Sequence, residues 1–246
     1  MKPGACVHAA AEYPAAMSSL PDLPPAVVAR LLAEHAPPTR APFVPELILH
    51  FAPDLVPVWE AVDALVGAPS SGSPAPFWAV PWVGGQAMAR TLLDHPEWVR
   101  GKRVLDFGAG SGIGTLAALL AGAAEILATE IDPVAVAVLR ANLALNGLAD
   151  RPEVRAEVVD VVGTDGGWDV VMAGDVCYER GPAGRIFPWL RGLAATRPVL
   201  MADPDRGFLP TEGLEAVARY EVPTHRDIDG RATRVTTVYR VSGPSD

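Results

Sequence analysis

The sequence predicts a doubly wound α/β fold, built on a mostly parallel sheet with an antiparallel hairpin at its C-terminal end. From residue 102 onward, short apolar β-branched runs alternate with helical segments, and this alternation implies parallel strands that are buried on both faces. The last part of the chain instead has two strand-like pieces around Asp229 and Gly230, a dipeptide typical of a hairpin turn. A chain of 246 residues with 50% hydrophobic content favours one main domain with a small appendage.

The residues before the predicted sheet divide into two parts. Residues 1–24 are rich in Ala, Pro and Ser without periodicity, so we expect a disordered or loosely attached segment. Residues 25–75 are expected to form a small helical extension with its linker, because apolar residues recur at helical spacing near 27–32 and again over 56–66. The linker is rich in Ser, Gly and Pro, which predicts a hinge. Residues 76–246 form the predicted main domain.

The elements of the main domain follow one another in a regular order. We expect strands at 103–107, 125–130, 154–159, 168–173 and 198–202, and helices at 112–122, 133–146 and 183–195. With the two pieces of the C-terminal hairpin, the predicted sheet has seven strands.

Charge and cysteine content exclude several classes of function. The formal net charge of −9 repels phosphate backbones and anionic lipids, so we expect no nucleic acid partner and no membrane partner. Cys6 and Cys177 cannot form a disulfide framework and neither has metal-ligand spacing, which favours a reducing compartment without a metal site. The first twenty residues lack the apolar core of a signal peptide, and no apolar run is long enough to span a bilayer, so we expect a cytoplasmic protein.

A glycine-rich turn, VLDFGAGSGIG, joins the first strand of the core to its helix. Gly108, Gly110 and Gly112 stand where doubly wound sheets bind ligands, between the carboxyl end of a strand and a helix N-terminus. The dinucleotide fingerprint needs Gly or Ala three places after its second glycine, where Ile113 stands here. Asp106 would also face a pyrophosphate with like charge. The turn therefore favours a cationic ligand over a dinucleotide.

Carboxylates also mark the ends of the next two strands. Glu130 lies about twenty residues beyond the glycines, where a carboxylate can accept bonds from both ribose hydroxyls, and Asp132 is the weaker candidate for that role. Asp160 ends the third strand. Asn142 and Asn146 follow in ANLALNG, and we expect them only to cap or stabilise the end of their helix.

The pattern D-x-G-x-G-x-G resembles motif I of the class I, seven-strand S-adenosylmethionine methyltransferases. The resemblance implies that the glycine turn packs against the methionine part of the cofactor and that Asp106 helps to hold its ammonium group. It also implies that Asp160 contacts the adenine amino group. S-adenosylmethionine carries a sulfonium cation, which suits a carboxylate-rich pocket without phosphate.

The fourth strand leads into GDVCYER, with Asp175 and Tyr178 in the pattern D-x-x-Y. An acidic-x-x-aromatic pattern at this place is typical of a branch of the same fold that methylates protein lysines. A lysine of pKa about 10.4 is neutral only about once in a thousand near pH 7.4, so methyl transfer needs a site that orients the amine and favours loss of its proton. Asp175 and Tyr178 are the expected catalytic residues. The alternatives are that Asp175 caps the following loop and that Tyr178 is a core residue. We interpret Cys177, which lies between them, as a small buried residue.

The stretch PFWAVPWVGGQAMARTLLD is more specific than the glycine turn. Together with RGKRVLDFGAGSG it resembles the electron transfer flavoprotein β-subunit lysine methyltransferases, and the similarity covers residues 39–241. The resemblance implies that Trp82, Gly84 and Gln86 lie against the cofactor and that Trp78 lies nearer the substrate entrance. Core packing is the alternative for both tryptophans.

The segment DPDRGF follows the fifth strand. Asp203 and Arg206 are therefore expected over the same end of the sheet as the glycine turn, in agreement with the D-P-x-R pattern that the resemblance implies. Arg206 either pairs with Asp203 or Asp205 and stiffens the loop, or shapes the mouth of a substrate site.

The sequence thus predicts a protein-lysine N-methyltransferase that uses S-adenosylmethionine and acts on the electron transfer flavoprotein β subunit. The alternatives are a methyltransferase for a ribosomal protein of the L11 type, a cofactor-binding protein without chemistry, and a dinucleotide-binding module. Asp175 with Tyr178 argues against the first two, and Ile113 with Asp106 argues against the third.

Overall fold

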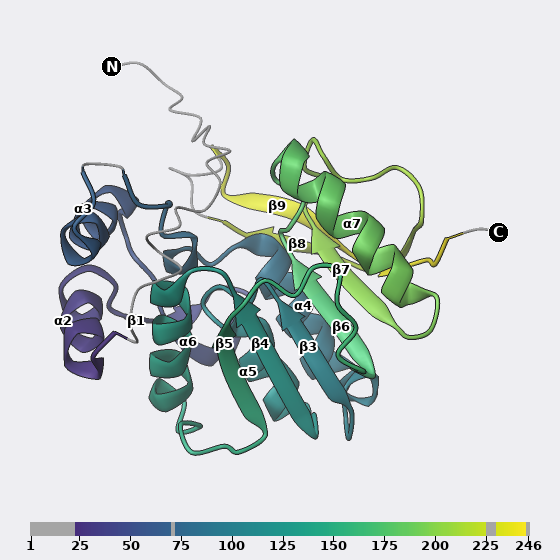
Figure 1. The fold of residues 1–246 in the computed structure, drawn as a ribbon, viewed down its shortest axis with the longest axis horizontal. Coiled ribbons are helices and arrows are strands. Elements are labelled where there is room, and N and C mark those ends of the chain that lie inside the picture. The colour runs from purple at the N-terminus through teal and green to yellow at the C-terminus, as the bar shows by residue number, and fades with distance from the viewer. Residues whose placement is uncertain (1–22, 70–71, 225–229, 245–246) are drawn as a thin grey trace.

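The computed structural model describes residues 23–69, 72–224 and 230–244. Its centre is a seven-stranded sheet with the strand order β5-β4-β3-β6-β7-β9-β8 (Figure 1). The strands are β3 Arg103–Phe107, β4 Glu125–Glu130, β5 Val154–Val158, β6 Val170–Gly174, β7 Val199–Asp203, β8 Leu214–Pro223 and β9 Thr233–Val241. Strands β3 to β7 run parallel, while β9 pairs antiparallel with both β7 and β8. The predicted fold class is confirmed, although residues 1–22 and Asp229 lie outside the described residues.

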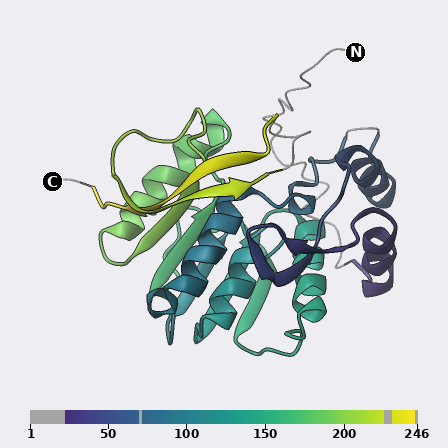
Figure 2. The same ribbon diagram turned by 180° about the vertical axis from the view of Figure 1, so that it is seen from behind.

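Helices cover both faces of the sheet. Helices α4 Val83–Asp94 and α5 Ile113–Leu120 lie behind the sheet in Figure 1 and in front of it in Figure 2, and α7 Arg180–Ala194 lies on the opposite face. The buried side chains of α4 and α5 form one core with the sheet, and those of α7 form a second. This double cover explains the apolar runs in β3 and β6, because a strand between two helical layers must be apolar on both faces.

Two helices of the core differ from their predicted extent. Helix α7 begins at Arg180 rather than at residue 183. Its first turn includes Pro182, which is tolerated there because its missing N–H removes no internal hydrogen bond. Helix α4 falls on a stretch for which the sequence predicted no element. Its glycine pair and the burial of most of its residues conceal the helical period.

The N-terminal extension is more than helical, which corrects the prediction for residues 25–75. Helices α2 Pro25–His35 and α3 Leu55–Val66 are present as expected, but between them strands β1 Pro38–Ala41 and β2 Val44–His50 form an antiparallel hairpin. The hairpin was missed because Pro38, Pro42 and Pro45 make the segment read as a loop.

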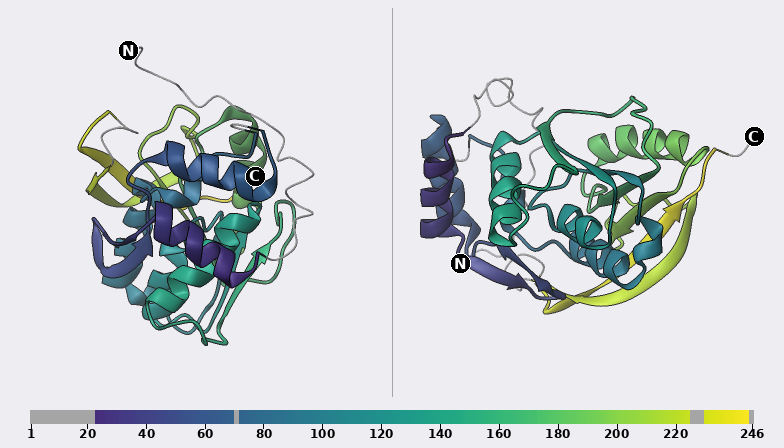
Figure 3. Two further views of the ribbon diagram at one scale, coloured as in Figure 1. Left: turned by 90° about the vertical axis from the view of Figure 1, so that its left-hand side faces the viewer. Right: turned by 90° about the horizontal axis from the view of Figure 1, so that it is seen from below.

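The extension shares its core with the main domain. Val28 and Leu32 of α2 pack in one buried cluster with Val134 and Val138 of α6 Pro133–Leu145, and Figure 3 shows α2 and α3 beside α6. The linker is anchored as well, since the backbone N–H and the hydroxyl of Ser73 both donate to Asp63 Oδ1, at 2.9 and 2.6 Å. The described part of the predicted hinge is therefore fixed, and residues 70–71 lie outside the description.

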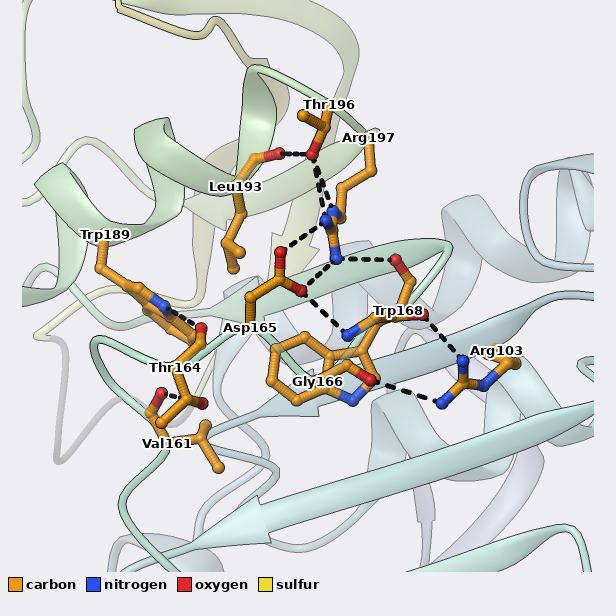
Figure 4. A network of polar contacts seen from close by, with 11 residues as sticks. Arg103, Val161, Thr164, Asp165, Gly166, Trp168, Trp189, Leu193, Thr196 and Arg197 are labelled. Atoms are coloured by element: carbon orange, nitrogen blue, oxygen red, sulfur yellow. Dashed lines mark hydrogen bonds and ion pairs between the residues drawn. The ribbon is translucent and has the colours of Figure 1, made fainter.

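A polar network supports the connection that leads from β5 to β6 (Figure 4). Arg197 donates from both terminal nitrogens to the carboxylate of Asp165, at 2.7 and 2.8 Å, and Arg103 Nη1 donates to Gly167 O at 3.0 Å. Trp189 Nε1 of α7 donates to Thr164 O at 2.8 Å. These bonds fix the connection between β5 and β6.

None of the helices in the described ranges combines the length and the apolar character needed to cross a bilayer.

Candidate active site

The glycine turn lies between β3 and α5 at the carboxyl end of the sheet. Gly108, Gly110 and Gly112 have φ angles of 64°, 53° and 82°, in the left-handed region that other residues rarely adopt. A side chain at Gly112 would also meet Leu139, since an added Cβ would lie 2.6 Å from its Cγ. The three glycines are therefore required by the shape of the turn itself.

Two carboxylates line this turn. Asp106 is buried at the end of β3, and its Oδ2 accepts a hydrogen bond of 2.6 Å from the hydroxyl of Thr115. Glu130 ends β4, and its Oε1 accepts from the backbone N–H of Gly110 at 2.9 Å while its Oε2 accepts from that of Ile131 at 3.0 Å. Burial raises the pKa of Asp106 to about 6 and that of Glu130 to about 7. Burial thus disfavours the ionised forms of both acids, and a positively charged ligand would favour them again.

Asp160 follows β5 and stands apart from these two acids. Its Oδ1 accepts from the backbone N–H of Val162 at 3.0 Å, and its Oδ2 forms an exposed ion pair of 2.8 Å with Arg185 of α7. Its contact with an adenine amino group stays a prediction.

Asp175 follows β6 in an unusual backbone conformation. Its φ angle is 55°, and its own N–H donates to Ala202 O of β7 at 2.9 Å, so the carboxylate is turned toward the start of α4. There Oδ2 accepts from the backbone N–H of Gly85 at 3.1 Å, and Oδ1 pairs with Arg206 Nη2 at 2.9 Å. Burial raises the pKa of Asp175, while the charge of Arg206 and the α4 amides act in the opposite direction.

Gly84 makes this position of Asp175 possible. A Cβ added at Gly84 would overlap the Asp175 carboxylate and would lie 2.7 Å from Ala202 O. Gly84 was expected to lie against the cofactor. That contact stays a prediction; the distances show that the absence of a side chain lets the start of α4 approach the ends of β6 and β7.

Three aromatic side chains pack together near Arg206, the partner of this carboxylate. Phe77, Trp82 and Tyr178 form what we name the aromatic rim, with ring centroids 5.9 Å apart for Phe77 and Trp82 and 5.5 Å apart for Phe77 and Tyr178. Trp82 Nε1 donates to Phe77 O at 2.7 Å, which fixes the two rings relative to each other. Tyr178 is 44% exposed and so is not a core residue. Partial burial raises the pKa of its hydroxyl to about 12, which keeps that hydroxyl protonated at neutral pH.

The comparisons with known proteins identify the family. Residues 88–175 match the family model described as Ribosomal protein L11 methyltransferase (PrmA). The electron transfer flavoprotein beta subunit lysine methyltransferase of Xenopus laevis is 35% identical over 198 residues, which cover 78% of this chain and 77% of the relative. This chain belongs to the electron transfer flavoprotein β-subunit lysine methyltransferase family.

Two further relatives of that name match over shorter spans. The protein of Danio rerio is 38% identical over 156 residues, which cover 61% of this chain and 60% of the relative. The protein of Mus musculus is 41% identical over 166 residues, which cover 64% of each chain. This chain thus spans 60% to 64% of the length of these two relatives.

Two residues of the flavoprotein methyltransferase motif lie away from the aromatic rim. Trp78 is 1% exposed and packs in the core shared by the extension and α6, so the alternative of core packing applies to it and the substrate entrance does not. Gln86 is fully buried. Its Oε1 accepts from the backbone N–H of Phe43, and its Nε2 donates to Pro81 O and Pro223 O, at 2.9, 2.7 and 3.3 Å. Because these bonds occupy its amide group, we assign Gln86 to the support of α4 and leave it out of the proposed cofactor site.

Phe77, which the sequence motif did not single out, belongs to the aromatic rim. Phe77 precedes the tryptophan that was chosen, and the structure turns Phe77 rather than Trp78 toward Tyr178. Phe77 and Trp78 are neighbours in the short 3₁₀ helix Phe77–Ala79 but face different partners, and the sequence pattern does not reveal this difference.

Asn142 and Asn146 do more than end α6. Asn142 Oδ1 accepts from His50 N at 2.9 Å, and Asn146 exchanges hydrogen bonds with the backbone of Ile48, so the two amides cover the free edge of β2. Asn142 Nδ2 also donates to Ser111 O at 2.8 Å, inside the glycine turn. This corrects the expectation that they serve the helix end alone, although Asn146 Nδ2 also bonds Asn142 O at 2.7 Å.

Asp203 and Cys177 are two further buried residues near Asp175. Asp203 is 1% exposed at the end of β7, its Oδ1 accepts from Arg206 N at 2.7 Å, and burial raises its pKa to about 6. Cys177 is fully buried against Met201, and burial raises the pKa of its thiol to about 12. Such a thiol is unreactive, in keeping with its interpretation as a small buried residue. In the described part of the chain, no group of three His, Cys, Asp or Glu side chains is arranged to hold a metal ion.

Proposed function

We propose that this protein is a protein-lysine N-methyltransferase that uses S-adenosylmethionine and acts on the electron transfer flavoprotein β subunit. The observation that carries the proposal is the position of Asp175. Its carboxylate follows β6, the strand beside β3, and it is bonded to the start of α4 and to Arg206, whose guanidinium lies over the Trp82 ring of the aromatic rim. A carboxylate with aromatic walls is a receptor for an alkylammonium group. The names of the relatives supply the choice of protein substrate.

The residues around the glycine turn fit a cationic nucleoside cofactor. A carboxylate can accept about four hydrogen bonds, so Glu130, which already accepts from backbone N–H groups of the turn and of its own loop, retains capacity for a ribose hydroxyl. Asp106 would interact with the ammonium end of the methionine part, and Asp160 with the adenine amino group. The raised pKa values of Asp106 and Glu130 support this assignment, because a bound cation favours their ionised forms. When bound, S-adenosylmethionine supplies an electrophilic methyl group on sulfur.

The chain's own residues prepare the amine of the substrate. Asp175 attracts and orients the lysine side chain, and Trp82 and Tyr178 exclude water from it. Desolvation disfavours the charged form of lysine, which offsets part of the roughly 4 kcal/mol needed to deprotonate a free lysine at neutral pH. The Tyr178 hydroxyl stays protonated and serves as a hydrogen-bonding group rather than as a base. The lysine proton leaves to water before transfer.

The partner and the location are part of the same proposal. A net charge of −9 supports a protein partner over nucleic acid. The buried free thiol of Cys177 supports a reducing, cytoplasmic environment.

Methyl transfer from a tritiated donor tests the proposal. Purified electron transfer flavoprotein and versions of its β subunit with single Lys→Arg substitutions are incubated with this protein and the donor. We expect label on the β subunit of the unchanged flavoprotein and loss of that label in one or more of the variants. Equal labelling of every variant, or no labelling of the unchanged flavoprotein, would contradict the proposal.

A further inference from the structure

Arg206 forms an ion pair with Asp175. Its guanidinium lies 2.9 Å from Asp175 Oδ1, and its Cζ lies 5.3 Å from the centroid of the Trp82 ring. The side chains of Arg206 and Asp175 are 16% and 10% exposed. An ion pair this well shielded is weakly screened by salt, so each partner strongly affects the charge that the other presents.

The loop that carries Arg206 is held in a defined shape. The backbone N–H of Arg206 donates to Asp203 Oδ1 at 2.7 Å, and its carbonyl accepts from Leu209 N at 2.9 Å. Asp205, just before it, has a φ angle of 63°. The guanidinium is thus positioned by a specific turn after β7, rather than by a freely moving surface side chain.

The charges around Asp175 are otherwise negative. In the described residues, Arg206 is the one cation that acts on Asp175 and on Tyr178. The other charges that act on Cys177 and Tyr178 are carboxylates, from Asp175, Asp203, Glu130 and Glu179. Helix α4 contributes backbone N–H groups to Asp175, and Trp82, just before the helix, contacts Arg206 with its ring.

An unpaired carboxylate would hinder methyl transfer to lysine. A negative charge within about 4–6 Å of an ammonium group raises its pKa by about 1–3 units and so retains the proton that blocks its lone pair. Asp175 would then bind the substrate firmly in an unreactive form. Pairing with Arg206 cancels this charge and leaves the carboxylate oxygens able to accept a hydrogen bond from a neutral amine.

We infer that Arg206 is a positioning residue that neutralises Asp175 and thereby sets the pH at which the bound lysine loses its proton. The inference deepens the proposed function and rests on it. Arg206 acts on lysine through Asp175 and has no part in holding the methyl donor.

Rates of methyl transfer measured across pH test this role. Arg206→Gln removes the charge and keeps a hydrogen-bond donor, Arg206→Lys keeps the charge, and Arg151→Gln removes an arginine from an exposed ion pair with Glu153 far from the site. For Arg206→Gln we expect the apparent pKa of kcat to rise by about one pH unit or more, with a loss of about tenfold near pH 7.5 that is recovered near pH 10. KM for the flavoprotein stays the same or falls. Arg206→Lys, which keeps the charge, should bring the apparent pKa back toward that of the unchanged protein whatever its rate, and Arg151→Gln should keep both the rate and the profile.

Results that overturn the inference can be told apart from results that overturn the proposed function. An equal loss of activity of Arg206→Gln at every pH, or a loss of donor binding in calorimetry, overturns the inference, because a merely structural role predicts those results. An unshifted profile with full activity overturns it as well. If the unchanged protein transfers no methyl group to the flavoprotein, the proposed function fails first, and the inference fails with it.

Discussion

Replacement of Gly84 by alanine should disable the site through a single methyl group. The added Cβ would overlap the Asp175 carboxylate and would lie 2.7 Å from Ala202 O, well inside the roughly 3.5–4.0 Å of a favourable contact. Either the start of α4 or the end of β6 must therefore move. Overpacking of this kind costs about 1–3 kcal/mol, and the better helix propensity of alanine returns at most about 1 kcal/mol. We expect a net loss of about 1–2 kcal/mol in the free energy of unfolding.

The effect on activity should exceed the effect on stability. A displacement approaching 1 Å at a reacting group can reduce turnover by about 100-fold, and Asp175 is the group that Gly84→Ala displaces. Urea unfolding measures the stability, and methyl transfer to the flavoprotein measures the activity. Gly184→Ala in α7 is the matched control, because nothing lies within 4 Å of its added Cβ. The control should be fully active and as stable as the unchanged protein or more so. A Gly84→Ala protein with the stability and turnover of this control would refute the reasoning.

Other predictions concern the cofactor site. Affinity for S-adenosylmethionine should rise between about pH 5.5 and 7.5 and then level off, because Asp106 and Glu130 ionise with pKa values of about 6 and 7; calorimetry that finds flat or falling affinity would contradict this. The protein without cofactor should lose stability as the pH rises from about 4 to about 7 and then level off, since these folded-state pKa values lie above the unfolded ones of 3.8 and 4.5; thermal unfolding checks the sign. Glu130→Ala should weaken cofactor binding about tenfold or more, and an unchanged dissociation constant would remove Glu130 from the ribose site. Asn142→Ala should cost about 1–3 kcal/mol of stability, because it leaves His50 N and Ser111 O without their partner; a change within about 0.5 kcal/mol would show that the amide link is dispensable.

The central strands could be predicted closely because their sequence signal is local. Strands β3 and β4 have the predicted bounds, since each is a short apolar run between clear turn signals. The hairpin of β1 and β2 was missed because its stability depends on distant residues. Asn142 and Asn146 satisfy the backbone of β2 from almost a hundred residues away along the chain, and no local pattern reveals such partners.

The arrangement of the acids followed from topology. Parallel strands bring their carboxyl ends together, so residues that end successive strands, such as Asp106, Glu130 and Asp203, were expected at one end of the sheet, where the structure has them. The direction of individual side chains did not follow. A motif read by resemblance does not say which face of a short helix is buried. For this reason the sequence left core packing open for Trp78, which the structure buries, and did not reveal that the amide of Gln86 is bonded to the backbone.

Asp175→Ala provides the most direct test of the central claim, that the Asp175 carboxylate receives the lysine while other acids hold the methyl donor. Calorimetry gives the affinity for S-adenosylmethionine, and transfer of tritiated methyl to the flavoprotein gives the turnover of the same preparation. The account predicts a loss of turnover of about 100-fold or more with a cofactor dissociation constant changed by no more than a few-fold. Turnover close to that of the unchanged protein, or a collapse of cofactor binding, would contradict it.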